Sequence, residues 1–225
     1  MSNHVVDRKN IFTCGFWNIV NEIILKSYFR RFALDGSENI PKSGPYLLIA
    51  NHVSRFDGLV LMKTIKGRPA NYMSHKSELR GYQGFVLRSV GAFEANRNPE
   101  TMAFMKEQLL KGQPIVMFPE GGIFVDGVVH PFKSGAARIM LMAAECGIDL
   151  PVIPVAITYS GSKGNRVAAV IVSEPIRLSA RQTAKSEQKP HCINQLTQEL
   201  HTHLSRQKEL LQLTVNRTER TTKVG

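Results

Sequence analysis

The chain is organised around a short apolar run that leads into a polar loop: Tyr46-Leu47-Leu48-Ile49-Ala50-Asn51-His52-Val53-Ser54-Arg55-Phe56-Asp57. Continuous apolarity over a short span after Ser43-Gly44-Pro45 predicts a buried strand at 45–50. The residues from Asp57 onward are typical of a helix, for which Ser54 is a candidate N-cap. His52 is therefore predicted to lie where a strand ends and a loop begins, which is where ligands gather in α/β proteins.

The spacing of His52 and Asp57 allows an acid–base pair. Across a turn, Asp57 could accept the N–H of one imidazole nitrogen while the other nitrogen faces a substrate. Asp57 would then fix the tautomer and stabilise the imidazolium, and the nearby helix N-terminus would keep the free His52 neutral and basic. An alternative stays open: Ser54-x-x-Asp57 also fits a capping box, in which Asp57 only closes the helix start.

Further short blocks follow in order down the chain: Lys76-Ser77-Glu78-Leu79, Gly91-Ala92-Phe93 through Arg97, Phe118-Pro119-Glu120-Gly121, Phe132-Lys133-Ser134-Gly135 and Ile153-Pro154-Val155-Ala156-Ile157. Together with Asn51-His52 and Asp57, this series resembles the signature blocks of the glycerolipid acyltransferases, the family of 1-acylglycerol-3-phosphate acyltransferase. The resemblance covers residues 40–160. A single block is a weak signal, whereas the ordered series is a strong one.

The resemblance implies roles for the matching residues. His52 and Asp57 would be the catalytic pair, and the substrate-binding residues would be Asn51, Arg97, Glu120, Gly121, Lys133 and Lys76. Arg97 would bind the phosphate of the acceptor, for which the guanidinium fork is suited. Lys133 and Lys76 are candidate contacts to phosphate or coenzyme A, and each can equally be a solvated surface lysine.

The third block both supports and departs from the family pattern. From its own position at a strand end beside Pro119 and two glycines, Glu120 is expected to accept backbone N–H bonds and shape the loop. After Gly121 the family usually has Thr and then Arg or Ser, whereas this chain has Gly122-Ile123-Phe124. Apolar side chains thus replace a polar, cationic arm, so the identity of the acceptor does not follow directly. Asp126, before Gly127, is expected to be a turn residue.

Composition indicates one globular domain in a reducing compartment. The chain has 225 residues, 43% hydrophobic and 21% charged, enough for a sizeable core. Its three cysteines lie far apart, without metal-type or disulfide spacing. Residues 1–10 are polar and resemble no signal peptide. We therefore expect a cytoplasmic location and an active site without metal or cofactor, where acyl-CoA or acyl-carrier protein enters as the donor substrate.

The net charge of +11 indicates an anionic partner. No nucleic-acid motif or aromatic stacking platform is present, so an anionic membrane or a phosphate-bearing substrate is favoured over nucleic acid. Apolar residues recur at helical spacing within 11–33, in a segment too short and too interrupted to span a bilayer. It is predicted to be an amphipathic helix at the membrane surface, making the protein a peripheral one; the alternative is a helix packed on its own domain.

Strand and helix patterns alternate along the chain. Strands are expected at 45–50, 70–74, 92–95, 114–118, 152–159 and 166–172, and helices at 57–66, 77–90, 100–111, 134–146 and 190–213. This predicts an α/β fold whose mostly parallel or mixed central sheet carries helices on both faces. The turn at 160–164 predicts a hairpin. We divide the chain into a membrane-associating segment (1–35), an acyltransferase domain (36–213) and a disordered tail (214–225).

The resemblance implies transfer of a fatty acyl group from acyl-CoA or acyl-carrier protein to the free hydroxyl of a lysophospholipid. The acceptor that fits best is 1-acylglycerol-3-phosphate, which would yield phosphatidic acid. Because no nucleophile is apparent, the hydroxyl would attack the thioester directly after His52 takes its proton. Two alternatives stay open: the same chemistry on another lysophospholipid or alcohol, and a non-catalytic protein that binds anionic membranes.

Overall fold

The structure is a computed structural model that describes residues 7–96, 98–178 and 189–224. Seven strands of this part form one sheet: β1 (Arg31–Asp35), β2 (Leu47–Ala50), β3 (Asn71–Ser74), β4 (Ala92–Glu94), β5 (Ile115–Met117), β6 (Val152–Ser160) and β7 (Val167–Val172). Their order is β1-β7-β6-β2-β5-β3-β4. The described helices are α1 (Ile11–Tyr28), α2 (Asp57–Thr64), α3 (Gly81–Ser89), α4 (Pro99–Leu110), α5 (Gly135–Glu145) and α6 (Lys189–Val224), with short 3₁₀ turns η1 (Ser37–Asn39) and η2 (Lys76–Leu79).

The sheet is mixed. Strands β6, β2, β5, β3 and β4 are parallel, whereas β7 runs antiparallel to β6, and β1 runs parallel to β7. The predicted hairpin at 160–164 is confirmed, because Ser160 pairs with Val167 across that turn. The carboxyl ends of the five parallel strands therefore meet at one edge, and the loops after β2 and β5 both emerge there.

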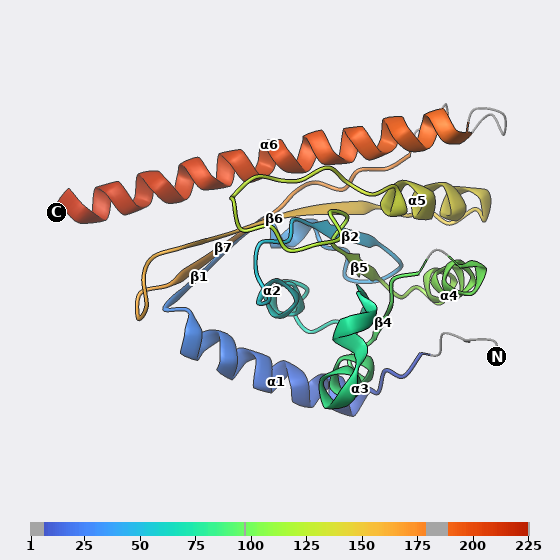
Figure 1. Cartoon of the computed structure of the whole chain (residues 1–225), viewed down its shortest axis with the longest axis horizontal. Coiled ribbons are helices and arrows are strands. Elements are labelled where there is room, and N and C mark those ends of the chain that lie inside the picture. The colour runs from blue at the N-terminus through green and yellow to red at the C-terminus, as the bar shows by residue number, and fades with distance from the viewer. Residues whose placement is uncertain (1–6, 97, 179–188, 225) are drawn as a thin grey trace.

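Helices cover both faces of the sheet, as predicted. Side chains of β2 alternate: Leu47 and Ile49 pack in a cluster with α4, α5 and α6, whereas Leu48 and Ala50 pack with α1 and α2. Figure 1 shows α5 and α6 on one side of the sheet and α1 and α2 on the other. Because both faces of β2 are buried, every residue of the strand must be apolar, which explains the continuous apolar run in the sequence.

The N-terminal boundary predicted at residue 35 needs correction. Helix α1 ends at Tyr28, and residues 31–35, which we assigned to the membrane-associating segment, form the edge strand β1. Arg31 pairs with Val167 and Asp35 with Ile171. The pairing partner is distant in the sequence, so no local pattern around residues 31–35 indicated a strand.

The C-terminal helix is longer than predicted. We expected its end at 213 and disorder from 214, but α6 continues to Val224. The segment 191–224 contains neither Gly nor Pro, so nothing in it interrupts the helical hydrogen bonds. One stripe of α6, made of Leu196, Leu200, Leu204 and Leu211, is buried against the domain.

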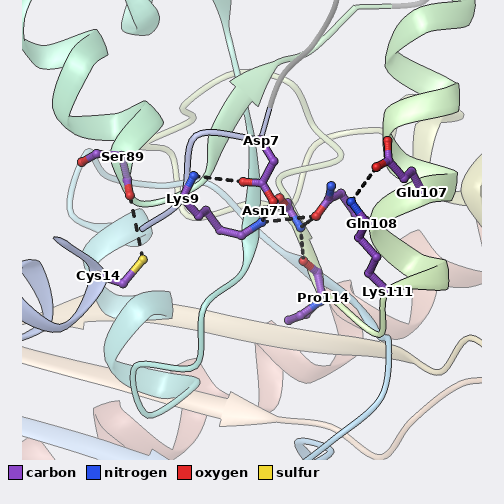
Figure 2. A network of polar contacts seen from close by, with 9 residues as sticks. All are labelled: Asp7, Lys9, Cys14, Asn71, Ser89, Glu107, Gln108, Lys111 and Pro114. Atoms are coloured by element: carbon purple, nitrogen blue, oxygen red, sulfur yellow. Dashed lines mark hydrogen bonds and ion pairs between the residues drawn. The ribbon is translucent and has the colours of Figure 1, made fainter. Parts of the chain in front are cut away.

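The first described residues are fixed near the amino ends of β3 and β5. The Lys9 ammonium contacts Asp7 at 2.9 Å, the Asn71 side-chain oxygen, and Gln108 Oε1 at 3.4 Å (Figure 2). The buried Asn71 amide also donates to the carbonyl of Pro114. This network ties the segment before α1 to β3 and α4, so it sets where α1 begins.

Candidate active site

His52 and Asp57 meet at the carboxyl edge of the sheet. His52 is the second residue after β2, and Asp57 is the first residue of α2. The Nδ1 atom of His52 lies 2.8 Å from Asp57 Oδ2, which is the contact that their spacing allows. The Asp57 side chain is 0% exposed, whereas that of His52 is 19% exposed. A buried carboxylate thus holds one side of an imidazole that solvent still reaches.

The Asp57 carboxylate is held by further donors. Oδ2 accepts the backbone N–H groups of Val53 (2.7 Å) and Ser54 (2.8 Å), and Oδ1 accepts the Tyr159 hydroxyl (2.6 Å). Burial, together with the neighbouring charge of Asp57, raises the pKa of Tyr159 far above its ordinary value, so the hydroxyl keeps its proton and donates. Asp57 therefore has two roles: it closes the loop between β2 and α2, and it orients the His52 ring. The prediction that Ser54 is the N-cap of α2 is wrong, because its hydroxyl accepts a hydrogen bond from Phe56 N, which precedes the helix.

The loop after β5 immobilises His52 through three contacts. Its ring stacks on Phe118, with centroids 4.0 Å apart. Its backbone N–H donates to Glu120 Oε1 at 2.7 Å, and its carbonyl accepts the N–H of Phe124 at 2.8 Å. The loop after β5 therefore sets the position of His52, the second residue after β2.

Glu120 shapes this loop, as its sequence position indicated. One carboxylate oxygen accepts from His52 N, and the other accepts from His130 N at 2.8 Å. Burial raises the pKa of Glu120, and these two backbone hydrogen bonds oppose the rise. Glu120 is 5% exposed. A contact between Glu120 and an acceptor stays a prediction.

Gly121 and Lys133 lie together beside Glu120. Gly121 has a φ of +72°, a conformation that L side chains rarely adopt, so a larger residue would be strained there; its Cβ would also displace the flexible end of the Lys133 side chain. The Lys133 N–H donates to the Pro119 carbonyl at 2.8 Å, while its exposed ammonium lies 3.4 Å from the Gly121 carbonyl. Lys133 thus places an exposed cation beside the loop that carries Glu120 and Gly121.

The remaining predicted binding residues are Asn51, Lys76 and Arg97. Asn51 is fully buried, and its amide is used internally: Nδ2 donates to Ile157 O at 3.0 Å and Oδ1 accepts Ile157 N at 2.7 Å. Lys76 is exposed at the start of η2, at the same edge of the sheet, and within the described residues no hydrogen bond joins it to His52. Arg97 lies outside the described residues.

The segment Gly122-Ile123-Phe124, which departs from the family's third block, makes contacts of its own with His130. The Phe124 ring stacks on His130 at 3.7 Å, and His130 Nε2 lies 2.7 Å from Asp126 Oδ2. Asp126 also accepts from Val128 N, in agreement with its predicted turn role. A second His–Asp contact therefore stands beside the first, and sequence inspection missed His130. Its signal was the four-residue spacing from Asp126.

Lys208 is the other residue that we missed. It belongs to α6, yet it is only 4% exposed. Burial lowers its pKa to about 8, against the opposing attraction of the Asp57 and Glu120 carboxylates. Its position was detectable, because Leu204 and Leu211 follow a helical stripe on which residue 208 must also lie.

Comparisons with known proteins show the family to which the chain belongs. A family model described as Acyltransferase matches residues 31–158, so the chain belongs to this family. It is 28% identical to human 1-acyl-sn-glycerol-3-phosphate acyltransferase alpha over 57% of this chain and 46% of that protein. It is 31% identical to a probable 1-acyl-sn-glycerol-3-phosphate acyltransferase of Mycoplasma pneumoniae over 57% of this chain and 48% of that protein. The chain thus spans about half the length of these curated relatives.

A solved structure shows the same fold. The crystal structure of the 1-acyl-sn-glycerophosphate (LPA) acyltransferase PlsC from Thermotoga maritima aligns with a TM-score of 0.66 at 20% identity. The alignment covers 88% of this chain and 79% of that one. Within the described ranges, no helix is long and apolar enough to cross a membrane.

Proposed function

We propose that this chain transfers a fatty acyl group from an acyl thioester to the free hydroxyl of a lysophospholipid, with 1-acylglycerol-3-phosphate as the first candidate. The observation that carries the proposal is the His52–Asp57 contact, because it joins the two residues of the family's first block at a solvent-reachable strand end. The names of the matched relatives support the choice of acceptor.

The geometry supports a direct transfer. Asp57 holds the proton on His52 Nδ1, which leaves Nε2 free to accept the proton of the acceptor hydroxyl. The hydroxyl oxygen attacks the thioester carbonyl carbon, the carbon–sulfur bond breaks, and the thiolate takes the proton back from the imidazolium. Acyl-CoA and acyl-carrier protein present the same thioester, so either can be the donor. Arg97, from the resemblance, and the exposed Lys133 would hold the acceptor phosphate.

The exposed face of α1 supports association with a membrane. Three of its polar side chains point inward: Asn18 donates to Gly67 O, Asn21 donates to Leu59 O, and Glu22 pairs with Lys63. Its exposed apolar side chains are Ile11, Phe12, Phe16, Ile19, Ile23 and Ile24. The helix therefore packs on its domain through these polar contacts and through the buried Cys14 and Leu25, and its exposed apolar stripe is available for contact with lipid.

A different acceptor is the second candidate. The site presents Ile123 and the Phe124–His130 stack where the family usually places polar residues. An acceptor with a less charged head group would lose less binding free energy at this position than an acceptor that needs a cation there.

Thiol release from a long-chain acyl-CoA tests the proposal. Release that requires 1-acylglycerol-3-phosphate, with phosphatidic acid detected by mass spectrometry, would support it. Release only with another lysophospholipid or alcohol would move the assignment to the second candidate. Vesicle binding without release from acyl-CoA or acyl-carrier protein, for any acceptor, would favour the non-catalytic membrane-binding protein.

A further inference from the structure

The amino end of α2, from which Asp57 reaches His52, has no side-chain cap. Its N-cap residue is Phe56, and an aromatic side chain offers no acceptor to the free N–H groups of the first turn. The Asp57 carboxylate is engaged elsewhere, because Oδ2 accepts from His52 and from the loop, and Oδ1 accepts from Tyr159. Other contacts must therefore fix the place at which α2 begins.

Aromatic rings supply these contacts. The Phe56 ring stacks on Tyr28 with centroids 4.0 Å apart, and it meets Phe29 edge to face at 5.6 Å. Tyr28 is the last residue of α1, and Phe29 is the C-cap of that helix. The end of α1 therefore packs against the residue that directly precedes Asp57.

A second route leads from the same rings to the Asp57 carboxylate. The Phe29 ring stacks on Tyr159 with centroids 5.3 Å apart, and the Tyr159 hydroxyl donates to Asp57 Oδ1 at 2.6 Å. Asp57 is thus held twice, through the main chain by Phe56 and through its carboxylate by Tyr159. We call Tyr28, Phe29, Phe56 and Tyr159 the ring cluster.

Tyr28 is also held from outside the ring cluster. The Arg166 guanidinium lies 4.2 Å from the centre of the Tyr28 ring, and since Phe56 covers one face of this ring, Arg166 occupies the other. The Arg166 carbonyl accepts the N–H of Arg30 at 2.9 Å, which ties Arg166 to the segment after α1. Tyr28 is half-buried, so changing it disturbs the core less than changing Phe29, which is 5% exposed. The Tyr28 ring is thus clamped between a cation and the N-cap of α2.

We propose that Tyr28 is a positioning residue whose stack on Phe56 fixes the start of α2 and so keeps Asp57 within hydrogen-bond distance of His52 Nδ1. The catalytic consequence rests on the proposed acyl transfer, whereas the effect on the His52–Asp57 contact does not. Tyr28 touches no reacting atom and acts through Phe56 and Asp57. Its ring, rather than its hydroxyl, is the part that acts, because the contacts with Phe56 and Arg166 are both made by the ring.

The test compares Tyr28→Leu, which removes the ring and keeps an apolar side chain, with Tyr28→Phe, which keeps the ring. Tyr82→Leu is the matched control, because Tyr82 is 79% exposed on α3. Nuclear magnetic resonance of the His52 ring nitrogens, assigned with His52→Ala at one pH where the ring is neutral, reports which nitrogen carries the proton. The values of kcat and KM for acyl transfer are measured at a temperature at which thermal melting shows every chain to be folded.

The parent chain should carry the His52 proton on Nδ1, because Asp57 accepts it there. In Tyr28→Leu, a looser start of α2 should release part of this proton to Nε2, so that the signals report a mixture of tautomers. The value of kcat should fall about tenfold, since small displacements of reacting groups are costly, while KM for acyl-CoA stays within about twofold of the parent. Tyr28→Phe and Tyr82→Leu should match the parent in all three measurements. A loss of stability alone would leave the tautomer of the folded chain unchanged.

Ring signals and kcat in Tyr28→Leu that match those of Tyr82→Leu would overturn the proposal. Equal losses in Tyr28→Phe and Tyr28→Leu would overturn it too, because the hydroxyl would then matter rather than the stack. If Tyr28→Leu does not fold, Phe56→Leu removes the other ring of the same stack and should give the same mixture of tautomers. Failure of both variants to fold would contradict a positioning role. A mixture in Tyr28→Leu, found for a parent chain without acyl-transfer activity, would uphold the positioning role and refute the proposed function instead.

Discussion

At the scale of single residues, His52 is held by groups from three segments: Asp57 from α2, Phe118 and Glu120 from the loop after β5, and Tyr159 of β6 through Asp57. This density of contacts around one imidazole fixes its orientation before a substrate binds. Pre-organisation of this kind supplies part of an enzyme's rate acceleration, since reactants and base need not be ordered during the reaction.

Replacing Tyr159 by Phe should weaken this arrangement without destroying it. Asp57 would lose one charge-assisted hydrogen bond and keep the donors Val53, Ser54 and His52, so the free energy of unfolding should fall by about 1–3 kcal/mol. Chemical denaturation measures the change. Tyr82→Phe, at an exposed position, is the control and should leave stability unaltered. Equal stability of the two variants would show that the Tyr159–Asp57 bond contributes nothing.

Lys208→Met should stabilise the fold in a pH-dependent way. The pKa of Lys208 falls from 10.5 to about 8, so between these values the unfolded chain binds more protons, and the parent protein gains stability as pH rises. Below pH 8 the parent bears the full cost of the buried ammonium. The variant should therefore be more stable by about 1–3 kcal/mol at pH 7, with the difference vanishing toward pH 10.5. Urea denaturation at several pH values measures the free energy of unfolding of both proteins. A difference between them that stays constant from pH 7 to pH 10.5 would show that the buried ammonium of Lys208 is not its cause.

The sequence allowed some residue-level features to be predicted and concealed others. His52, Asp57 and Glu120 lie at strand ends that local apolarity reveals, so their proximity followed from the topology of parallel strands. Lys208 comes from a helix 88 positions after Glu120. The stripe of Leu204 and Leu211 showed that Lys208 lies on the inward face of α6, but the packing of that face on β6 is a long-range contact that no local pattern records.

At the scale of secondary-structure elements, the same distinction applies. Strands such as β2 and β6 were predictable because both of their faces are buried, which demands continuous apolar residues. Strand β1 lies at the sheet edge with exposed Arg31 and Asp35 at its ends, so its composition resembles a loop. The helix end at 213 was wrong because polarity was interpreted as disorder in a segment that lacks helix breakers.

Helix α1 should anchor the protein to anionic vesicles through its outward stripe. Replacing Phe16 and Ile19 together by Glu should weaken vesicle binding by at least about tenfold, because each buried apolar side chain contributes roughly 1.5–3 kcal/mol. Co-sedimentation with phosphatidylglycerol-containing vesicles measures the loss. Leu210→Glu with Leu213→Glu, exposed apolar positions on α6, is the matched control. Equal loss in both double variants would show that α1 is not the contact.

At the scale of the whole molecule, the net charge of +11 should make association with membranes depend on salt. Binding to anionic vesicles should weaken as ionic strength rises, and binding to neutral vesicles should be weaker and nearly independent of salt. Calorimetric titration at several salt concentrations measures both. A response identical for the two vesicle types would show that the basic surface plays no part in the association.

The central claim is that His52, oriented by Asp57, removes the proton from the acceptor hydroxyl. Thiol release from a long-chain acyl-CoA with 1-acylglycerol-3-phosphate, compared between the parent protein and His52→Ala, tests this most directly. In the variant, kcat should fall by about 10²- to 10⁴-fold, while the thermal melting profile should stay close to that of the parent. Near-normal turnover in a folded His52→Ala protein would contradict it.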